Sequence, residues 1–374
     1  MTEWHVITGE YPPQPGGVSD YTRLVAEELV RAGDSVTVWA PPCSPQPAAL
    51  GSVTVHRLPD HFGWRSLRHL TRALAGSPRR LLVQYVPHAF GWRGANLPFC
   101  RWLRSRRSDS VWVMFHEVAY PFSRDDSVAH NALAIVNRMM AGLVARAAER
   151  MFVSIPAWQP LVRQLNGAHP VAWLPVPSGV PVTAEACDVS RIRARYAYGS
   201  PLVGHFGTYG GPIGSLVDPA MDVLLERTRA QVLLLGRRSD EVAREFERTR
   251  PRFNGRVTGA GQLAPQDVSN HIAACDVMMQ PYPDGVSTRR TSAMAALAHG
   301  RPIVTTTGWL TERLWEESEA VALVAVDAPD QMAAAVARLL DDEPARRALS
   351  ERARALYTDR FDVSHTIRAL RAPR

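Results

Sequence analysis

The sequence predicts an α/β protein made of two doubly wound, Rossmann-like domains with a helical C-terminal tail. The chain has 374 residues, which is more than one domain of ordinary size. In both halves, short β-rich runs alternate with amphipathic helical patterns, as in βαβ units that form parallel sheets. A stretch rich in proline, glycine and small residues, Trp173–Ala184, separates the halves. We therefore expect two lobes facing across a cleft that binds the ligand.

The opening of the chain is predicted to be a βαβ unit. Ser19 or Asp20 is expected to cap its amphipathic helix, and Gly33 to end it. The predicted elements are strand Trp4–Thr8, a proline and glycine loop over 9–17, helix Ser19–Arg31 and strand Ser35–Ala40, followed later by strands Leu81–Val86 and Val111–Phe115.

The same alternation restarts after Tyr196 and predicts the second domain. A glycine-rich loop follows its first strand, and Pro219 is expected in the first turn of the next helix, after Asp218 as the cap. The predicted strands are Leu202–Phe206, Val232–Leu235, Arg256–Thr258, Val277–Gln280 and Pro302–Thr306, and the predicted helices include one from Ser239, one ending near Ala274, Thr291–His299 and Glu343–Leu356, with a last segment from Val363.

Composition restricts the chemistry. All 43 basic residues are arginines, and the net charge is +7. A chain without lysine forms no Schiff base, so anion binding falls to guanidinium groups, backbone amides and helix N-termini. The four cysteines are far apart and form no CxxC pair, which argues against a zinc ribbon or a disulfide scaffold and favours a reducing compartment.

No signal peptide or membrane span is expected from the sequence. The N-terminus reaches a proline pair before an apolar segment develops, and the apolar stretch Ala132–Val144 is short and contains Asn137 and Arg138. A cytoplasmic location is therefore predicted, with peripheral contact between arginine-rich surface and an anionic inner membrane as a further expectation.

Two glycine loops are candidate ligand sites, because glycine lets the backbone approach a ligand and a helix N-terminus offers amides. Neither loop has the GxGxxG spacing of a dinucleotide site, and a P-loop would need a lysine. The alternative for the first loop is a plain turn. The first loop contains Gly16, Gly17, Ser19 and Asp20, and the second contains Gly207, Thr208, Tyr209 and Gly210.

The segment Gln280–Ser292 is the most informative of the chain. It places the acid Asp284, a tight turn and the adjacent cations Arg289 and Arg290 between a strand end and a helix start. Guanidinium groups and first-turn amides together suit a diphosphate. The alternative is a solvated Asp-Gly turn followed by exposed arginines.

His116 ends a predicted strand, where it could contact a substrate hydroxyl or stabilise a developing cation. A structural histidine is the alternative, and Glu117 and Glu10 near strand ends cannot be ranked as acids or bases. The sequence has no Asp-x-Asp, HExxH or GxSxG motif, so no metal site is predicted. Scattered arginine pairs without interleaved aromatics indicate solvated faces rather than a nucleic-acid site.

These segments resemble a GT-B glycosyltransferase of family 4 over nearly the whole chain. The opening EYPPQPGGVSDYTRLVAEELVRAGDSVTVWAP is similar to the family's first loop and helix, and GRVTGAGQLAPQDVSNHIAACDVMMQPYPDG with AMAALAHGRPIVTT is similar to its nucleotide-binding half. The resemblance implies an acceptor-binding domain over 1–178, a nucleotide-sugar-binding domain over 179–355, and a helical segment over 356–374 that packs back on the first domain.

The family carries two glutamates with seven residues between them, and the matching positions here are Asp284 and Ser292. The family's arginine and lysine after the first strand of the second domain are missing, and Arg289 and Arg290 are our candidate replacements. The resemblance thus implies catalytic roles for His116 and Asp284. Implied donor contacts are Gly17, Thr208, Tyr209, Gly210, Arg237, Gly285, Val286, Ser287, Arg289, Arg290 and Ser292, and implied acceptor contacts are Gly16, Ser19, Asp20 and Glu117.

The implied reaction is transfer of a sugar from a nucleotide diphosphate sugar to a small-molecule or glycan acceptor, with retention and without a metal or other cofactor. Two alternatives stay open. One is a pseudo-glycosyltransferase that couples a nucleotide-activated cyclitol, and the other is a non-catalytic nucleotide-binding scaffold. The arginine-rich composition indicates a GC-rich bacterial source, in carbohydrate or secondary-metabolite biosynthesis. No nucleic-acid partner is expected, and donor base, sugar, acceptor and oligomeric state stay open.

Overall fold

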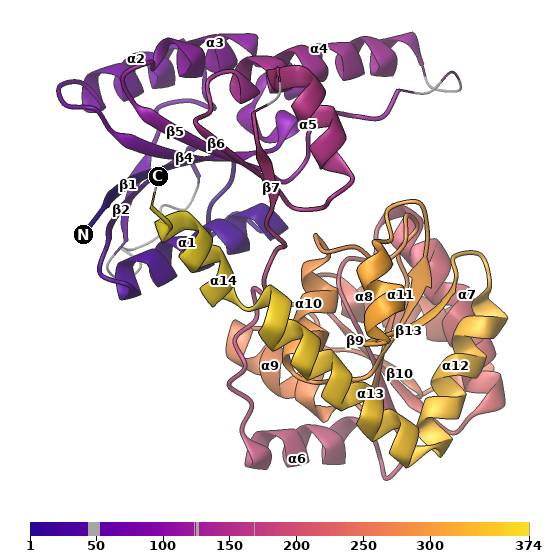
Figure 1. The fold of residues 1–374 in the computed structure, drawn as a ribbon. Coiled ribbons are helices and arrows are strands. Elements are labelled where there is room, and N and C mark those ends of the chain that lie inside the picture. The colour runs from indigo at the N-terminus through magenta and orange to yellow at the C-terminus, as the bar shows by residue number, and fades with distance from the viewer. Residues whose placement is uncertain (44–52, 123, 125–126, 168, 374) are drawn as a thin grey trace. The chain divides into compact units, whose positions relative to one another are not determined.

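The computed structural model describes residues 1–43, 53–122, 124, 127–167 and 169–373. They form two compact units (Figure 1). Unit 1 comprises Met1–Pro175 together with Val363–Arg374, and unit 2 comprises Val176–Asp362. The boundary lies inside the proline-rich segment that the sequence predicts as the linker, three residues before the expected division at 178.

Unit 1 is built on a parallel sheet of seven strands in the order β3-β2-β1-β4-β5-β6-β7. The strands are short and almost wholly apolar, as expected for a sheet covered by helices on both faces. Their bounds are β1 Glu3–Thr8, β2 Ser35–Ala40, β3 Thr54–Arg57, β4 Arg80–Tyr85, β5 Ser110–Phe115, β6 Arg150–Val153 and β7 Val171–Trp173. Thr8 pairs with Gln84, and Gln84 with Met114, so strands β1, β4 and β5 end at one edge.

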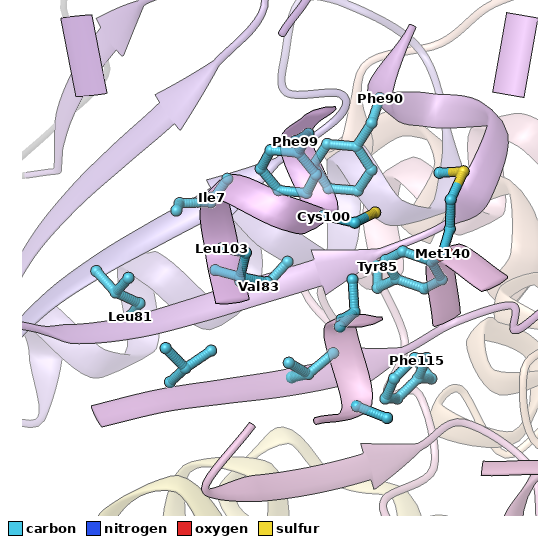
Figure 2. Close-up of a cluster of buried hydrophobic side chains, with 14 of the residues drawn as sticks. Ile7, Leu81, Val83, Tyr85, Phe90, Phe99, Cys100, Leu103, Phe115 and Met140 are labelled. Atoms are coloured by element: carbon cyan, nitrogen blue, oxygen red, sulfur yellow. The ribbon is translucent and has the colours of Figure 1, made fainter. Parts of the chain in front are cut away.

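The helices of unit 1 cover the two faces of this sheet, with α2, α3, α4 and α5 on one face in Figure 1. They are α1 Gly17–Arg31, α2 Trp64–Ala73, α3 Leu97–Ser105, α4 Val128–Ala145, α5 Trp158–Asn166 and α14 Val363–Arg371, with short 3₁₀ turns over Pro87–Phe90 and Trp92–Gly94. Figure 2 shows the core between strands and helices, where Phe90 and Phe99 stack 4.3 Å apart near Tyr85 and Met140.

The last helix, α14, belongs to unit 1 although it follows unit 2 in the sequence. It packs against α1, and the guanidinium of Arg371 lies 3.2 Å from the buried carboxylate of Asp34. The carbonyl oxygen of Ala372 also accepts a hydrogen bond from Arg150, at the start of β6. These contacts fix the C-terminal segment on the first lobe.

Helix α4 is, among the described residues, the one helix long and apolar enough to cross a bilayer, with a mean hydropathy of 1.2 over 18 residues. It also has the contacts of a core helix. Met140, Ala141 and Val144 are buried in the core of unit 1. The side chain of Asn137 donates to the carbonyl of Gly94 at 2.6 Å, and Arg138 donates to that of Tyr120 at 3.0 Å. Asn137 and Arg138 are therefore used inside the domain.

Unit 2 has a second parallel sheet, of six strands in the order β10-β9-β8-β11-β12-β13. The strands are β8 Leu202–Phe206, β9 Gln231–Leu235, β10 Val257–Gly259, β11 Val277–Gln280, β12 Ile303–Thr307 and β13 Ala322–Ala325. The helices are α6 Ala186–Tyr196, α7 Gly211–Arg227, α8 Ser239–Thr249, α9 Pro265–Ala274, α10 Thr291–Ala298, α11 Arg313–Ser318, α12 Pro329–Asp341 and α13 Glu343–Leu356, followed by a π turn over Tyr357–Phe361. The doubly wound prediction is confirmed in both units.

Two predicted helix starts are wrong. Helix α1 begins at Gly17, two residues early, and neither Ser19 nor Asp20 caps it. Helix α7 begins at Gly211 with Pro212 in its first turn, so Pro219 lies inside the helix and Asp218 is not its cap. A proline in the interior removes one backbone hydrogen bond. Pro219 lines a cavity of about 190 Å³ together with Pro281 and Thr306. Val217 and Met221 on either side of it are buried in the core, so tertiary packing supports the helix here.

Candidate functional site

Three glycine turns meet at the carboxyl edge of the unit 2 sheet. The amide of Gly207, after β8, donates to the carbonyl of Leu235, and the amide of Gly236, after β9, donates to that of Gly261. Gly236 has φ 117°, and a Cβ there would stand 2.2 Å from the Gly207 carbonyl oxygen. Only glycine fits at such a position. The edge therefore presents bare backbone, as a site that approaches a ligand closely requires.

The residues on these turns differ in whether they are accessible to a ligand. Thr208 and Gly210 are exposed. Tyr209 is turned inward, because its hydroxyl donates to the carbonyls of His205 and Leu235 and its ring packs against His205. Arg237 is exposed and has no hydrogen-bond or ionic partner among the described residues. Of the donor contacts expected here, Thr208, Gly210 and Arg237 are thus accessible, whereas the Tyr209 hydroxyl is occupied.

The loop between β11 and α10 holds one carboxylate between two guanidinium groups. Arg289 Nη2 lies 2.7 Å from Asp284 Oδ2, and Arg290 binds the other oxygen, Oδ1. The three side chains retain exposed fractions of 22%, 20% and 13% for Arg289, Arg290 and Asp284, so they border solvent and are not in the core. The two guanidinium groups thus share one carboxylate.

The cluster is continued by Tyr282 and Ser292. The Arg290 guanidinium lies 4.7 Å from the centroid of the Tyr282 ring, a cation–π contact. The Tyr282 hydroxyl is 2.8 Å from Ser292 Oγ in the first turn of α10, and burial raises its pKa to about 12. Ser292 Oγ is also 4.0 Å from where a Cβ on Gly207 would stand, which places the start of α10 beside the first glycine turn.

A buried glutamate braces the same loop. Glu312 accepts hydrogen bonds from the amide and the hydroxyl of Thr288 and from Trp315 Nε1, at 2.9, 2.6 and 2.7 Å. Burial raises the pKa of Glu312, and these hydrogen bonds oppose the rise. Gly285 has φ 84°, and a Cβ there would lie 2.3 Å from the Gly308 amide nitrogen. The arginines therefore extend from a backbone fixed at both ends.

In this region the buried side chains of Gln280 and Ser287 have no hydrogen-bond partner among the residues that the structure describes. Gln280 ends β11 with no exposed surface, and both atoms of its amide lack a hydrogen bond, as does the hydroxyl of buried Ser287. Val286 is a core residue, with its amide donating to the Thr306 carbonyl. Unsatisfied buried polar groups are rare in native proteins and call for a water or a ligand. They lie at the strand end next to the expected pyrophosphate site.

In unit 1, the start of α1 is occupied by a carboxylate of the chain itself. Glu10 Oε1 accepts from the Ser19 amide at 2.9 Å, and the Val18 amide also stabilises this carboxylate. A Cβ on Gly16 would stand 2.4 Å from Glu10 Oε1, so glycine at 16 makes room for it. Burial raises the pKa of Glu10 against these hydrogen bonds. The anion position that the sequence offers to a ligand at Gly16 and Gly17 is thus filled by Glu10.

Of the residues expected to bind the acceptor, some are buried and others are accessible to solvent. Ser19 is fully buried, and its hydroxyl donates to the Gln14 carbonyl at 2.6 Å. Asp20 is exposed in the first turn of α1. Glu117 is half-exposed, with a carboxylate oxygen 3.7 Å from His88 Nδ1. Asp20 and Glu117 therefore remain accessible, while Ser19 holds the loop.

His116 follows β5 and is 6% exposed. Its Nε2–H donates to Gln84 Oε1 at 2.8 Å, which leaves Nδ1 as an acceptor, and its carbonyl accepts from Ser154 Oγ. The ring of Tyr21 packs edge-on at 4.7 Å. Burial lowers the pKa of His116 to about 3. The imidazole is consequently neutral at physiological pH, and it is held in place by the hydrogen bond to Gln84.

Comparison with known proteins gives a family match to part of unit 2. Residues 212–342, from the start of α7 to the end of α12, match the family profile described as glycosyl transferases group 1. The matched region contains Arg237, the Asp284 loop and Ser292, so the candidate donor site lies within it. No curated protein sequence matches the chain.

Solved glycosyltransferase structures share the GT-B fold of this chain. Sucrose-phosphate synthase from Thermosynechococcus elongatus is 18% identical with a TM-score of 0.74, covering 99% of this chain and 97% of its own. Anabaena HepE, solved with UDP-glucose, is 17% identical with a TM-score of 0.69, covering 99% and 98%. WaaG, a glycosyltransferase involved in lipopolysaccharide biosynthesis, is 15% identical with a TM-score of 0.68, covering 99% and 100%. At these identities the likeness establishes the fold.

Sequence reasoning missed three residues that organise the two sites. The sequence did not predict the role of Glu10 at the start of α1, and it gave no reason to select Glu312 or Gln280. Glu10 had one signal, a carboxylate shortly before a glycine pair at a helix start. Glu312 reaches Thr288 across 24 positions, and no local pattern marks such a contact.

Proposed function

We propose that this chain is a glycosyltransferase that moves a sugar from a nucleotide diphosphate donor to a hydroxyl of a small-molecule or glycan acceptor. The observation that carries the proposal is the Arg289–Asp284–Arg290 cluster directly ahead of α10. Each guanidinium has five N–H donors, and Asp284 engages only part of them. The helix adds first-turn amides, since no side chain caps its start. A pyrophosphate matches this arrangement of donors.

In this mechanism the leaving nucleoside diphosphate is the group whose charge grows. Donors already aimed at that charge stabilise the transition state without reorganisation. Arg289 and Arg290 supply two positive charges on a braced loop, with Arg237 as a third candidate from the neighbouring turn. Guanidinium groups and amides do the work of a divalent cation here, which is why we propose metal-independent transfer. Asp284 orients both arginines and is our candidate for the sugar side of the donor.

Unit 1 is proposed to bind the acceptor. Neutral His116 would hydrogen-bond a substrate hydroxyl through Nδ1, and the accessible carboxylates Asp20 and Glu117 would accept hydrogen bonds from further hydroxyls. Retention at the anomeric carbon belongs to the family 4 resemblance and forms part of the same proposal. HepE was solved with UDP and UDP-glucose, which supports UDP as the first nucleotide to test.

Nucleotide titration tests the donor site. We expect UDP, GDP, ADP or TDP to raise the melting temperature with concentration, and calorimetry with the best ligand to give a Kd. Arg289→Ala and Arg290→Ala should each weaken binding by about 1.5–3 kcal/mol, the cost of a lost charged hydrogen bond. Arg313→Ala is the matched control, because Arg313 is exposed and pairs only with Glu317. Equal affinity in both site variants and the control would refute the proposed site.

Turnover tests the reaction. Slow release of nucleotide from a panel of nucleotide sugars, accelerated by an acceptor, would support transfer. Binding without turnover of any sugar would favour the scaffold alternative, and turnover of only a nucleotide-activated cyclitol would favour the pseudo-glycosyltransferase. Product NMR reports the anomeric configuration, and a chelator should leave the rate unchanged. Inversion, or loss of rate on chelation, would overturn the corresponding part of the proposal.

A further inference from the structure

The positive charge of the chain is concentrated in one segment of unit 1. Residues 61–108 contain ten of the 43 arginines and none of the 36 acidic residues, so the rest of the chain carries 33 arginines against 36 acids. This segment, which we call the basic segment, includes α2 and α3, which lie along one face of the seven-stranded sheet (Figure 1). The net charge of +7 is thus a property of this surface.

The arginines of the basic segment have few partners. Seven of them are exposed and have no ionic or hydrogen-bond partner for their side chains among the described residues: Arg65, Arg68, Arg72, Arg93, Arg101, Arg104 and Arg107. Several exposed arginines of unit 2 are instead paired with acids. Arg244, Arg248 and Arg347 lie 2.6–3.0 Å from carboxylates of Asp240, Glu245 and Glu343 on their own helices.

An apolar groove runs between the two helices of the basic segment. Its volume is about 690 Å³, and it is lined by Trp64, Leu67, Arg68, Thr71, Arg72, Leu97, Pro98, Arg101 and Trp102. Trp102 Nε1 donates to Thr71 Oγ1 at 2.9 Å and joins the helices at the groove. Trp64 is 60% exposed and meets the 46% exposed Trp92 edge-on. The groove combines an apolar wall with three cations.

We propose that this face docks on a membrane rich in anionic phospholipid, with acyl chain or glycerol in the groove and head-group phosphates on the arginines. Tryptophan prefers the membrane–water interface, and arginine lays its stem on apolar surface while its charge reaches the phosphates. A basic surface with exposed tryptophans is what interfacial binding requires. The proposal is independent of the donor site, which lies in the other unit.

The observations favour a bilayer over two other occupants. A second copy docking through the same face would bring seven unpaired arginines against seven more, and like charges across an interface repel. On the unit 2 helices, Asp240, Glu245 and Glu343 already bind arginines of their own. A nucleic acid would meet the arginines but would leave the apolar groove unfilled.

Vesicle co-sedimentation of the full chain tests the proposal. We expect binding to equimolar phosphatidylcholine and phosphatidylglycerol, none to phosphatidylcholine alone, and release by salt. The variant Arg68→Gln/Arg72→Gln/Arg101→Gln should bind about a hundredfold more weakly, at about fivefold per arginine near an anionic surface. Trp64→Ala should weaken binding about tenfold without touching any charge. Melting temperatures and nucleotide affinity establish that each variant is folded.

The matched control is Arg244→Gln/Arg248→Gln/Arg347→Gln in unit 2, which removes the same formal charge from paired positions. It should retain vesicle binding within about threefold, because screening limits charges far from the contact. Equal losses in both triple variants would reduce the effect to net charge and overturn the proposal. Vesicle binding by the Arg68 triple variant at wild-type strength would also overturn it, as would binding of duplex DNA without any binding of anionic vesicles.

Discussion

The starts of helices α1 and α10 have comparable places at the ends of sheet strands but different electrostatics. Both follow a strand of a parallel sheet and neither has a side-chain cap on its own N-cap residue. At α1, the carboxylate of Glu10 accepts the free amides. At α10, two arginines precede the helix, and the carboxylate of Asp284 binds those arginines instead of the amides. One helix start is neutralised from within the chain, and the other keeps its positive end.

The difference teaches that a helix N-terminus after a glycine loop is an anion site only when the chain has not filled it. The helix dipole is worth about 0.3–1 kcal/mol to an anion at the surface, less than a charged hydrogen bond. The partner of the nearest carboxylate therefore decides which helix start remains open. On this argument the α10 start attracts an external anion and the α1 start does not, and the following variants test that contrast.

The largest expected effect comes from Asp284→Asn. Turnover should fall about 10²–10⁴-fold, the range for loss of an acid or base at the reacting centre, while UDP binding becomes tighter because both arginines are released to the pyrophosphate. Single-turnover kinetics and calorimetry measure the two quantities. Asp240→Asn is the control, since Asp240 pairs with Arg244 at an exposed position of α8. Unchanged turnover with weakened UDP binding would contradict a catalytic role for Asp284 and would show that it only positions the two arginines.

Gly285→Ala should destabilise the loop that carries the arginines. A positive φ costs a non-glycine residue about 1–3 kcal/mol, and the added Cβ also meets Gly308 backbone. Gly76→Ala is matched, because Gly76 has φ 99° with open space around its Cβ position. The free energy of unfolding in urea should fall more in Gly285→Ala than in Gly76→Ala, with UDP affinity lost only in the former. Equal losses of stability in Gly285→Ala and Gly76→Ala would show that the loop at Gly285 shifts away from the Gly308 backbone and avoids the collision.

Gly16→Ala should act through Glu10. Gly16 has extended backbone at φ 170°, so alanine brings no backbone strain and its Cβ collides only with the Glu10 carboxylate. We expect a loss of about 1 kcal/mol in unfolding free energy, comparable to the loss in Glu10→Ala, where the same hydrogen bonds disappear. The double variant should lose little more than either single one. Additive losses would mean that Glu10 does not serve the α1 amides.

The smallest effect concerns pH. Burial raises the pKa of Glu10 above the value of 4.5 in the unfolded chain, so the folded chain binds this proton more tightly. The contribution of Glu10 to stability is therefore greatest at low pH and falls as the pH rises through the window that begins near 4.5. In Glu10→Gln this decline should vanish, so the stability of wild type relative to variant decreases in urea titrations as the pH rises above about 4.5. A difference independent of pH would contradict the raised pKa.

The sequence specified the strands of unit 2 closely, since runs such as those of β8, β9 and β11 are apolar, short and bounded by turns. It failed where tertiary packing outweighed a local signal. Pro219 resembles a first-turn residue, yet α7 continues through it because the helix buries Val217 and Met221 on the sheet. Ser19 resembles a cap, yet Glu10 is closer to the amides. Strands β3, β6, β7 and β13 were not predicted; each is only three or four residues long, and unlike β11, strands β3 and β13 are not fully buried.

The candidate site was predictable as a segment but not as a set of contacts. The turn Asp284–Gly285 and the pair Arg289 and Arg290 are visible in the sequence, because they lie between a strand and a helix. That both arginines share one carboxylate depends on loop geometry, which Glu312 imposes from 24 positions away. The neutral state of His116 likewise depends on burial, which comes from packing of distant elements.

The glycine at 236 has a consequence for Arg237, the exposed cation beside it. A residue with any side chain at 236 would collide with the Gly207 carbonyl, so this corner of the backbone has little room to adjust. The Arg237 guanidinium can therefore change position only through rotation of its own side-chain torsions, because the backbone at Gly236 is rigid. Ordering it on a phosphate costs only the rotamer freedom of one side chain, about 2 kcal/mol, and no loop has to be frozen along with it.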